Sequence, residues 1–177
     1  MPAAVDLRAR IRDIPDFPKP GIVFKDITPL LLDPDALGAA VDGLVEIAQP
    51  LDVDLVVAAE ARGFILGAAL AREIGAGFIP ARKPGKLPAE VLTARYALEY
   101  GLDALEVHED AVAGRPRVLV HDDLLATGGT ARALCDLVGM RGGTVVGCAF
   151  LVELMFLGGR ERLDPIPVES LIAFERE

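Results

Sequence analysis

Residues 117–135 read R-V-L-V-H-D-D-L-L-A-T-G-G-T-A-R-A-L-C and combine four features in a fixed order. The apolar run 118–120 has the composition of a buried strand. An acidic pair, Asp122 and Asp123, follows where we expect this strand to end. After the small-residue turn T-G-G-T (127–130), apolar residues recur at i, i+3, i+4 and i+7, as on one face of a helix. The stretch therefore predicts a strand, an acidic pair, a tight loop and a helix.

Each part of this unit suits a sugar phosphate. A small-residue loop that opens a helix lets unpaired backbone N–H groups converge on a phosphate, and the helix dipole favours the negative charge. The hydroxyls of Thr127 and Thr130 add donors, and two adjacent carboxylates suit the vicinal hydroxyls of a ribose, or a Mg²⁺ beside it. The nucleoside-triphosphate pattern G-x-x-x-x-G-K-[ST] and the dinucleotide pattern G-x-G-x-x-G are both missing. An ordinary strand-to-helix turn remains the alternative for T-G-G-T taken alone.

The segment V-H-D-D-L-L-A-T-G-G-T (120–130) resembles the phosphoribosyl-pyrophosphate signature of type I phosphoribosyltransferases. Within that family, residues 122–130 most resemble the sequence of adenine phosphoribosyltransferases. His121 departs from the family, which usually carries an aliphatic residue there. We expect it to end the strand facing neighbouring side chains and assign it no catalytic role. By the resemblance, the residues that bind the ribose and the 5′-phosphate are Asp122, Asp123, Ala126, Thr127, Gly128, Gly129 and Thr130.

The composition is that of one domain with a large core. The chain has 177 residues, 52% of them hydrophobic, but we find no apolar run long enough for a membrane span and no secretory signal at the N-terminus. The net charge of −9 argues against a nucleic-acid partner, which normally meets a basic face. Cys135 and Cys148 lie in apolar segments and are expected to be free thiols in a reducing cytoplasm.

A second strand–loop–helix unit precedes the first. Residues 55–59 read as a buried strand, E-A-R-G (60–63) as a loop, and the apolar residues from 64 to about 74 as a helix. Alternating strands and helices predict an α/β domain with a parallel sheet, in which ligands collect at the carboxyl ends of the strands. The remaining expected elements are a helix at 34–49 behind the N-cap Asp33, and strands at 77–81, 144–152 and 168–174.

The resemblance extends this outline over most of the chain. It implies the type I phosphoribosyltransferase fold over residues 1–177, a mostly parallel central sheet flanked by helices, with a small N-terminal hood (about 13–32) and a flexible lid (about 82–101). The E-A-R-G segment resembles the family's pyrophosphate loop, which assigns Glu60, Ala61 and Arg62 to pyrophosphate. A guanidinium fork matches phosphate oxygens, although an arginine at a helix start can also be a surface residue.

The N-terminal region predicts a short amphipathic helix over residues 5–14 and then an ordered irregular segment, because residues 13–31 contain five prolines among large apolar residues. By resemblance this segment is the hood over the base. Phe24 would stack on the purine, the backbone of Val23 and Lys25 would read its edge, and Leu154 would close the pocket. The alternative for Phe24 is a plain core aromatic.

The segment R-K-P-G-K-L-P (82–88) places three cations among proline and glycine. By resemblance it begins the lid, with Arg82, Lys83 and Lys86 facing the diphosphate, whereas a solvated loop is the alternative. Residues 93–101 alternate as in a strand, which favours a two-stranded lid hairpin. Glu99, in the quartet L-E-Y-G, takes the family's acid/base role at the purine ring by resemblance. A glutamate on an alternating strand can also simply face solvent.

The sequence is thus identified as a type I phosphoribosyltransferase that joins adenine to the phosphoribosyl group of phosphoribosyl pyrophosphate, giving AMP and pyrophosphate. Mg²⁺ is expected to arrive with phosphoribosyl pyrophosphate, without direct metal ligands from the protein. A cytoplasmic homodimer without nucleic-acid or membrane partners is expected. The alternatives are the same chemistry on hypoxanthine or guanine, and a regulator that senses phosphoribosyl pyrophosphate. The regulator would need a DNA-binding module, for which this acidic chain has no spare length.

Overall fold

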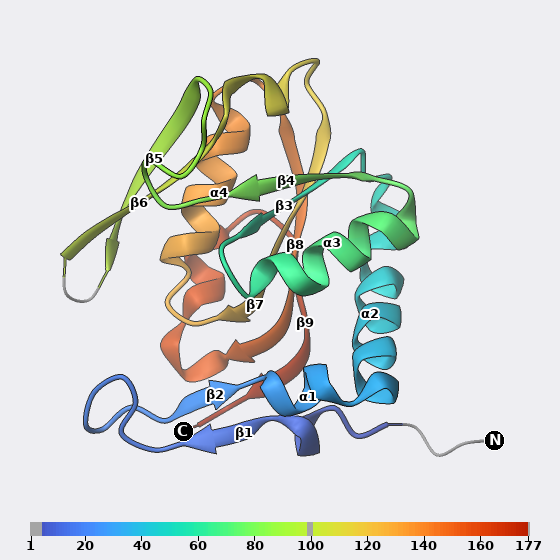
Figure 1. Ribbon diagram of the computed structural model, residues 1–177, viewed down its shortest axis with the longest axis vertical. Helices are drawn as coiled ribbons and strands as arrows, with labels where there is room; N and C mark the ends of the chain where they lie inside the picture. The colour runs from blue at the N-terminus through green and yellow to red at the C-terminus, as the bar shows by residue number, and fades with distance from the viewer. Residues whose placement is uncertain (1–4, 99–100, 177) are drawn as a thin grey trace.

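The computed structural model describes residues 5–98 and 101–176, and its centre is a five-stranded sheet in the order β4-β3-β7-β8-β9 (Figure 1). Each neighbouring pair in this sheet is parallel. This confirms the predicted α/β architecture. The strands are β3 (Leu55–Ala59), β4 (Gly77–Ala81), β7 (Arg117–Leu125), β8 (Thr144–Leu154) and β9 (Val168–Phe174).

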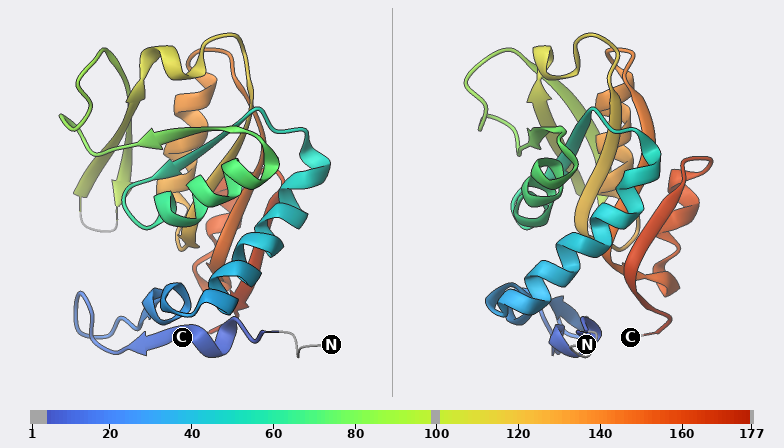
Figure 2. Two further views of the ribbon diagram at one scale, coloured as in Figure 1. Left: turned by 45° about the vertical axis from the view of Figure 1, so that its right-hand side comes forward. Right: turned by 90° about the vertical axis from the view of Figure 1, so that its right-hand side faces the viewer.

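Helices cover both faces of this sheet, as the turned views show (Figure 2). Val57 and Val120 belong to the buried cluster that includes one side of α4, whereas Val56 and Leu119 belong to the cluster with α2 and α3. Neighbouring strand residues point to opposite faces, so both sides of the central strands are buried, which explains their continuous apolar runs. The helices are α1 (Thr28–Leu32), α2 (Pro34–Ala48), α3 (Gly63–Ile74) and α4 (Gly129–Gly139).

The start of α2 follows the predicted cap. The Asp33 carboxylate accepts hydrogen bonds from the backbone N–H groups of Asp35 at 3.0 Å and Ala36 at 3.2 Å, and Pro34 occupies the first helical position. In the described ranges, no helix has the length and apolar character needed to cross a membrane. The short 3₁₀ turns are η1 (Arg8–Arg10), η2 (Gln49–Leu51), η3 (Glu109–Val112), η4 (Met155–Leu157) and η5 (Gly159–Leu163).

Two small antiparallel sheets flank the central one. The predicted two-stranded hairpin forms from β5 (Val91–Leu98) and β6 (Gly101–His108). It packs against α4 on the side away from the central sheet (Figure 1). The pair of β1 (Arg12–Ile14) and β2 (Phe24–Asp26) lies across the carboxyl ends of the central strands. The two additions therefore approach the same end of the sheet from different sides.

The helix predicted for residues 5–14 is wrong. Only the 3₁₀ turn η1 forms, and residues 12–14 pair as β1 with β2, with Arg12 opposite Asp26. The guanidinium of Arg12 lies 2.6 Å from the Asp26 carboxylate. Hydrogen bonds from the backbone N–H of Thr28 and from Arg12 lower the pKa of Asp26 to about 2. The expectation of an irregular segment over 13–31 is also wrong in part, because β2 and the start of α1 lie within it.

The last strand supports this N-terminal pair. The ring of Phe174, at the end of β9, lies between two cations: its centroid is 4.5 Å from Lys25 Nζ and 4.6 Å from Arg8 Cζ. Lys25 is only 3% exposed, and its ammonium also pairs with Asp13 at 2.8 Å. Residues from the two ends of the described chain therefore hold β2 in place.

The predicted end of the strand before the acidic pair is wrong, because β7 continues to Leu125. Its pairing with β3 stops at His121, whereas its pairing with β8 continues through Asp122, opposite Phe150, to Leu125. Asp122 and Asp123 therefore lie on an extension of β7 that is free of β3, beside the loop that follows β3.

His121 lies within β7 rather than at its end. It is fully buried, and its Nδ1 is 2.9 Å from the carbonyl oxygen of Ala149. Gly67 of α3 lies close, because a Cβ added there would be 3.1 Å from His121 Cδ2. Burial lowers the pKa of His121 from 6.5 to about 4, and the hydrogen bond to Ala149 opposes this only in part.

This lowered pKa makes the free energy of unfolding depend on pH. The unfolded chain binds a proton at His121 below pH 6.5, whereas the folded protein resists it down to about pH 4. Stability therefore falls as the pH drops through this window, by about 3 kcal/mol from this residue. Urea unfolding of the His121→Val variant between pH 7 and 4.5 should show a smaller decline than the wild type. Equal declines would contradict the assignment of this titration to His121.

Candidate active site

The two predicted loops meet at the carboxyl ends of β3 and β7. Residues 60–62 connect β3 to α3, and residues 126–128 connect β7 to α4. Because β3 and β7 are parallel neighbours, both loops leave the sheet at the same edge. The sheet topology thus brings together segments that are more than sixty positions apart in the sequence.

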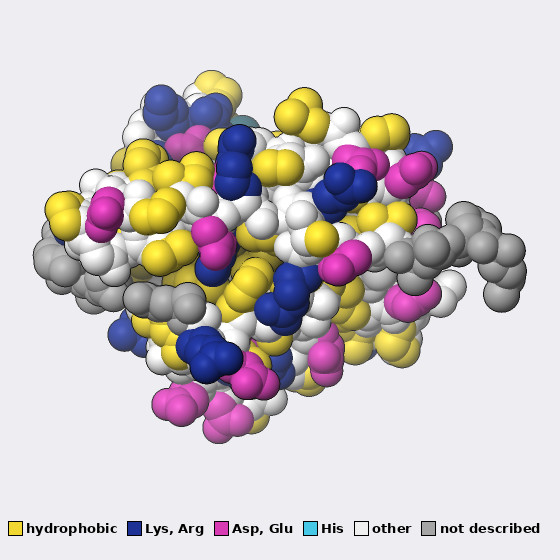
Figure 3. Space-filling view, turned by 90° about the horizontal axis from the view of Figure 1, so that it is seen from below, with side chains coloured by type: hydrophobic (Ala, Val, Ile, Leu, Met, Phe, Trp, Pro, Cys, Tyr) yellow, Lys and Arg dark blue, Asp and Glu magenta, His cyan; other side chains and the backbone are white. Residues whose placement is uncertain are grey.

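A cavity of about 360 Å³ opens between this edge and the hood segment (residues 13–32). Seen from below, this face of the molecule shows hydrophobic side chains with Lys and Arg side chains among them (Figure 3). The residues that line this cavity include some predicted to bind the base, some predicted to bind the phosphate and one predicted to bind pyrophosphate. Its lining consists of Pro18, Lys19, Ile22, Val23, Phe24, Lys25, Arg62, Leu124, Ala126, Thr127, Leu154 and Leu157.

Five of these lining residues were not predicted as site residues from the sequence: Pro18, Lys19, Ile22, Leu124 and Leu157. Leu157 follows β8 in the run M-F-L-G-G, and its side chain is 38% exposed. The exposure of Leu157 is known only from the fold, and the sequence showed no more than three large apolar residues before a glycine pair.

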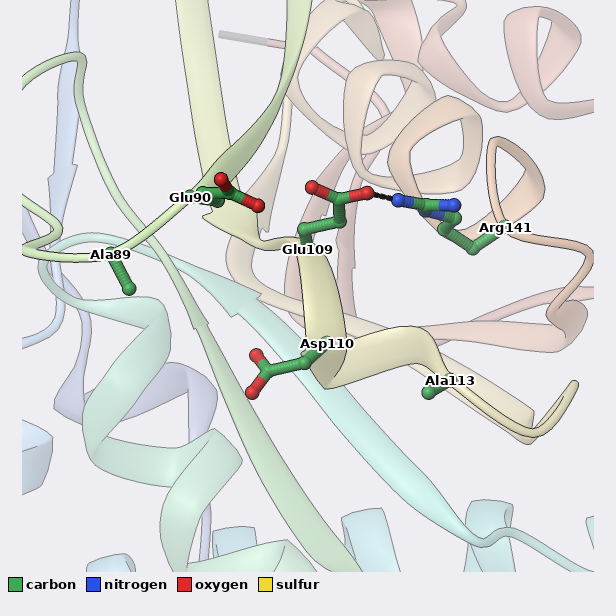
Figure 4. Close-up of a pocket in the computed structure, with 6 residues that line it drawn as sticks. All are labelled: Ala89, Glu90, Glu109, Asp110, Ala113 and Arg141. Carbon is green, nitrogen blue, oxygen red and sulfur yellow. Dashed lines mark ion pairs between the residues drawn. The ribbon is translucent and has the colours of Figure 1, made fainter.

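Another cavity, of about 630 Å³, lies between the segment before β5, the 3₁₀ turn η3 and the turn after α4 (Figure 4). Its lining residues flank the amino end of β7 and the carboxyl end of α4. They are Ala89, Glu90, Glu109, Asp110, Ala113 and Arg141. Glu109 points to Arg141 and forms an ion pair with it. The remaining carboxylates make this cavity unsuitable for a phosphorylated substrate, and no predicted site residue reaches it.

Arg62 connects the hood to the acidic pair. Its Cζ lies 4.7 Å from the centroid of the Phe24 ring, and its Nε lies 3.0 Å from Asp123 Oδ2. The Nη1 atom of Arg62 is buried and has no hydrogen-bond partner within residues 5–98 and 101–176. A buried donor without a partner is costly, so this atom is suited to an acceptor brought by a ligand. Phe24 meets the cavity, and its outer edge packs against Phe17 at 5.2 Å between ring centroids.

The acidic pair is compact. The backbone N–H of Asp123 donates to Asp122 Oδ1 at 2.9 Å, and Asp123 is only 4% exposed. Burial, reinforced by the neighbouring charge of Asp123, raises the pKa of Asp122 well above its ordinary value. Burial also raises the pKa of Asp123, while the Arg62 guanidinium opposes this. Hydroxyl donors or a cation beside the pair would favour its charged form.

The loop of residues 126–130, predicted to bind the phosphate and called the phosphate loop below, depends on the glycine before α4. Gly128 has φ = 80°, in the left-handed region, and no side chain caps the amino end of this helix in the described residues. A Cβ on Gly128 would lie 2.5 Å from the carbonyl oxygen of Gly159. The position therefore excludes other residues on both conformational and steric grounds. It leaves the first N–H groups of α4 open to an anion.

The cations of residues 82–88 are divided between two carboxylates. Arg82 Nε lies 2.9 Å from the Glu60 carboxylate, which also accepts the N–H of Lys83 at 2.9 Å. Burial acts to raise the pKa of Glu60, but these hydrogen bonds and the charges of Arg82 and Lys86 together lower it. The Lys83 ammonium instead pairs with Asp103 on β6, and Lys86 is exposed. Glu99, the predicted acid/base, lies outside the described residues.

No protein-family model matches this sequence. The adenine phosphoribosyltransferase of Prochlorococcus marinus (strain MIT 9303) is 56% identical over 171 residues, which cover 96% of this chain and 99% of the relative. The chain belongs to the adenine phosphoribosyltransferase family. Its fold agrees with the family member of Thermoanaerobacter pseudethanolicus, a crystal structure with a TM-score of 0.93, 53% identity and coverage of 95% of this chain and 98% of that one.

A second solved structure of the family contains ligands. The Saccharomyces cerevisiae adenine phosphoribosyltransferase, complexed with adenine and D-2,5-dideoxy-2,5-imino-altritol 1,6-bisphosphate, has a TM-score of 0.87 and 37% identity, covering 93% of this chain and 96% of that chain. As a member of the adenine phosphoribosyltransferase family, this chain is a pentosyltransferase. It transfers the 5-phosphoribosyl group from phosphoribosyl pyrophosphate to adenine, giving AMP and pyrophosphate. The predicted fold, family and reaction are therefore confirmed.

The close contacts of Gly128 allow a test of whether the phosphate loop binds phosphoribosyl pyrophosphate. The substitution Gly128→Ala should raise KM for phosphoribosyl pyrophosphate by about 10- to 100-fold, because the loop must shift by a fraction of an ångström or more. It should also lower Tm, because the Cβ would meet the backbone of Gly159. Steady-state kinetics and thermal unfolding measure the two effects.

Gly139→Ala, at the other end of α4, is the matched control. A Cβ there would meet nothing within 4 Å, so neither KM nor stability should suffer. An unchanged KM in the Gly128→Ala variant would exclude the loop from phosphate binding.

Proposed function

We propose that the cavity between the hood segment and the sheet is where adenine and phosphoribosyl pyrophosphate react. The observation that carries this proposal is the position of Arg62, whose guanidinium contacts Phe24 on the base side and Asp123 on the sugar side. The ligands of the yeast relative, a purine base and a bisphosphate of a sugar analogue, support a site of this double character.

The base is assigned to the apolar half of the cavity. Phe24 stacks on the purine and Leu154 closes the opposite side, since both line the cavity while Leu154 is only 8% exposed. Val23 and Lys25 read the base edge through their backbone. The Lys25 ammonium is already engaged by Asp13 and Phe174, which supports a role for its backbone rather than for its charge.

The sugar phosphate is assigned to the extension of β7 and the loop after it. Asp122 and Asp123 accept hydrogen bonds from the ribose hydroxyls. The N–H groups and hydroxyls of residues 126–130 bind the 5′-phosphate at the amino end of α4. Mg²⁺ enters as part of the phosphoribosyl-pyrophosphate complex, and the neighbouring carboxylates of the acidic pair suit the hydroxyls and cation that come with it.

The diphosphate is assigned to the loop after β3. The unpartnered Nη1 of Arg62 supplies a buried donor, the backbone of residues 60–61 lies beside it, and Arg82 is held at the loop by Glu60. Lys83 and Lys86 belong to the lid, about residues 82–101, which closes over the diphosphate. Closure requires Lys83 to exchange its partner Asp103 for a phosphate oxygen.

The chemistry needs no protein nucleophile, because a ring nitrogen of adenine attacks the anomeric carbon as pyrophosphate departs. Positive charge develops on the ribose, as in glycoside cleavage, and Asp122 and Asp123 lie on its side of the cavity. Cations around the leaving diphosphate stabilise its negative charge. The closed lid excludes water that would otherwise hydrolyse the activated sugar. Glu99 exchanges a proton with the purine ring.

We also propose that the protein acts as a homodimer in the cytoplasm, without nucleic-acid or membrane partners. The homodimer rests on family expectation, and the net charge of −9 supports the absence of a nucleic-acid partner.

Base choice tests the base-site assignment. Adenine presents an amino donor at C6 and an acceptor at N1, and hypoxanthine reverses both. Backbone groups cannot exchange donor for acceptor, so kcat/KM should favour adenine over hypoxanthine by at least about 10³-fold. Pyrophosphate release with adenine, hypoxanthine, guanine and xanthine measures this preference. Comparable turnover of adenine and hypoxanthine would overturn the base-site assignment and leave the phosphate-site assignment standing.

Two variants separate backbone from side-chain recognition. Lys25→Met removes the ammonium but keeps the apolar stem. The variant should keep the preference for adenine over hypoxanthine, although the loss of the ion pair with Asp13 should lower Tm. Phe24→Ala should raise KM for adenine, because the stacking surface is lost.

Glu99→Gln tests the acid/base role. A general acid or base contributes about 10²–10⁴-fold, so kcat should fall by that factor while both KM values change little. Glu90→Gln, an exposed glutamate just before β5, is the control and should keep the wild-type kcat. A decrease of less than about threefold would leave Glu99 as part of the lid structure only.

A further inference from the structure

The loop of residues 154–159 touches both halves of the proposed site. Leu154 and Leu157 line the cavity on the base side. Gly159 lies directly against the phosphate loop: a Cβ added to it would be 2.2 Å from the carbonyl oxygen of Ala126 and 3.0 Å from the backbone nitrogen of Gly128. This one loop therefore forms a wall for the base and a support for the residues assigned to the 5′-phosphate.

An ion pair ties the two ends of this loop together. Arg160 Nε lies 3.0 Å from Glu153 Oε1, and Arg160 Nη2 lies 2.6 Å from Glu153 Oε2. The Ser170 hydroxyl donates to the same carboxylate at 2.8 Å, and Arg160 Nη1 donates to the carbonyl of Val168. A bidentate guanidinium–carboxylate pair fixes orientation as well as distance. We call these two residues the Glu153–Arg160 clasp.

The chemistry of the clasp is unusual for its position. Glu153 is 3% exposed and lies between the buried residues Val152 and Leu154 at the end of β8. An apolar residue would fill such a position without the cost of burying a carboxylate, so a buried ion pair is weak evidence for a stabilising role. What this pair provides is a fixed geometry between β8, β9 and the residue that follows Gly159.

We propose that Glu153 and Arg160 are positioning residues for both substrates. The clasp fixes the 154–159 loop, so that the base wall at Leu154 and Leu157 and the support under the phosphate loop keep a constant separation. This inference rests on the proposed assignment of the cavity. Neither residue touches substrate, and both act through the loop between them.

Two conservative variants test the clasp. Arg160→Lys keeps the charge but loses the planar fork, and Glu153→Gln keeps the shape but loses the charge. Both should weaken the binding of adenine and, separately, of ribose 5-phosphate, each by about three- to thirtyfold, the range typical of residues that act through packed neighbours. Isothermal titration calorimetry with the two ligands measures this, and kcat should change less than either KM.

Arg117→Lys is the matched control. Arg117 also donates two guanidinium hydrogen bonds, to the carbonyls of Asp52 at 2.8 Å and Leu51 at 2.9 Å, but it lies at the amino end of β7, away from the cavity. This variant should lower Tm without weakening either ligand. Equal loss of affinity in Arg117→Lys and Arg160→Lys would overturn the proposal, because the effect would then be one of general stability.

Measuring adenine and ribose 5-phosphate separately distinguishes failure of the clasp proposal from failure of the cavity assignment. Weakening of only one ligand by the clasp variants would overturn the shared positioning role, and so would unchanged affinity for both. In either case, a raised KM in Gly128→Ala would still support the cavity assignment. Unchanged kinetics in Gly128→Ala as well would show that the cavity assignment itself is wrong.

Discussion

The guanidinium of Arg62 lies where three separate parts of the chain meet. Arg62 lies at the end of the loop between β3 and α3. The parallel pairing of β3 with β7 brings Asp123 to 3.0 Å from its Nε, and the hood segment places the Phe24 ring 4.7 Å from its Cζ. The ion pair with Asp123 leaves one buried nitrogen without an acceptor. A site with such an unsatisfied donor is organised for an anion, because burying the donor alone would only reduce stability.

Unequal strand lengths make this arrangement possible. The pairing of β7 with β3 ends at His121, while β8 supports β7 as far as Leu125. The acidic pair is therefore held by β8 on one edge of β7, while the loop after β3, rather than a strand, lies along the other edge. Fixed support for buried carboxylates suits the proposed ribose site, because it positions the acceptors before the sugar arrives.

The parts of the fold predicted correctly from the sequence depend on local patterns. The buried strands show continuous apolar runs, α2 has an Asp-Pro start, and the phosphate loop has its small residues in order. The errors lie where distant residues decide the structure. Residues 12–14 form a strand because β2 pairs with them, and β7 extends past Asp123 because β8 does.

The same limit applies to the site. Phe24, Arg62 and Thr127 could be placed by resemblance and do share one cavity, but the contribution of Leu157 and Gly159 depends on how the chain turns after β8. The glycine pair at 158–159 indicated a turn and could not indicate what the turn supports.

The packing of Lys25 and Arg8 against the Phe174 ring has a consequence for folding during synthesis. During synthesis the hood segment leaves the ribosome before β9, yet its strand β2 packs against the Phe174 ring at the end of β9. Lys25 cannot be buried against that ring until β9 has joined the sheet. The part of the cavity proposed to bind the base is therefore completed only after β9 has been made, and a nascent chain that stops short of β9 lacks the surface against which β1 and β2 pack.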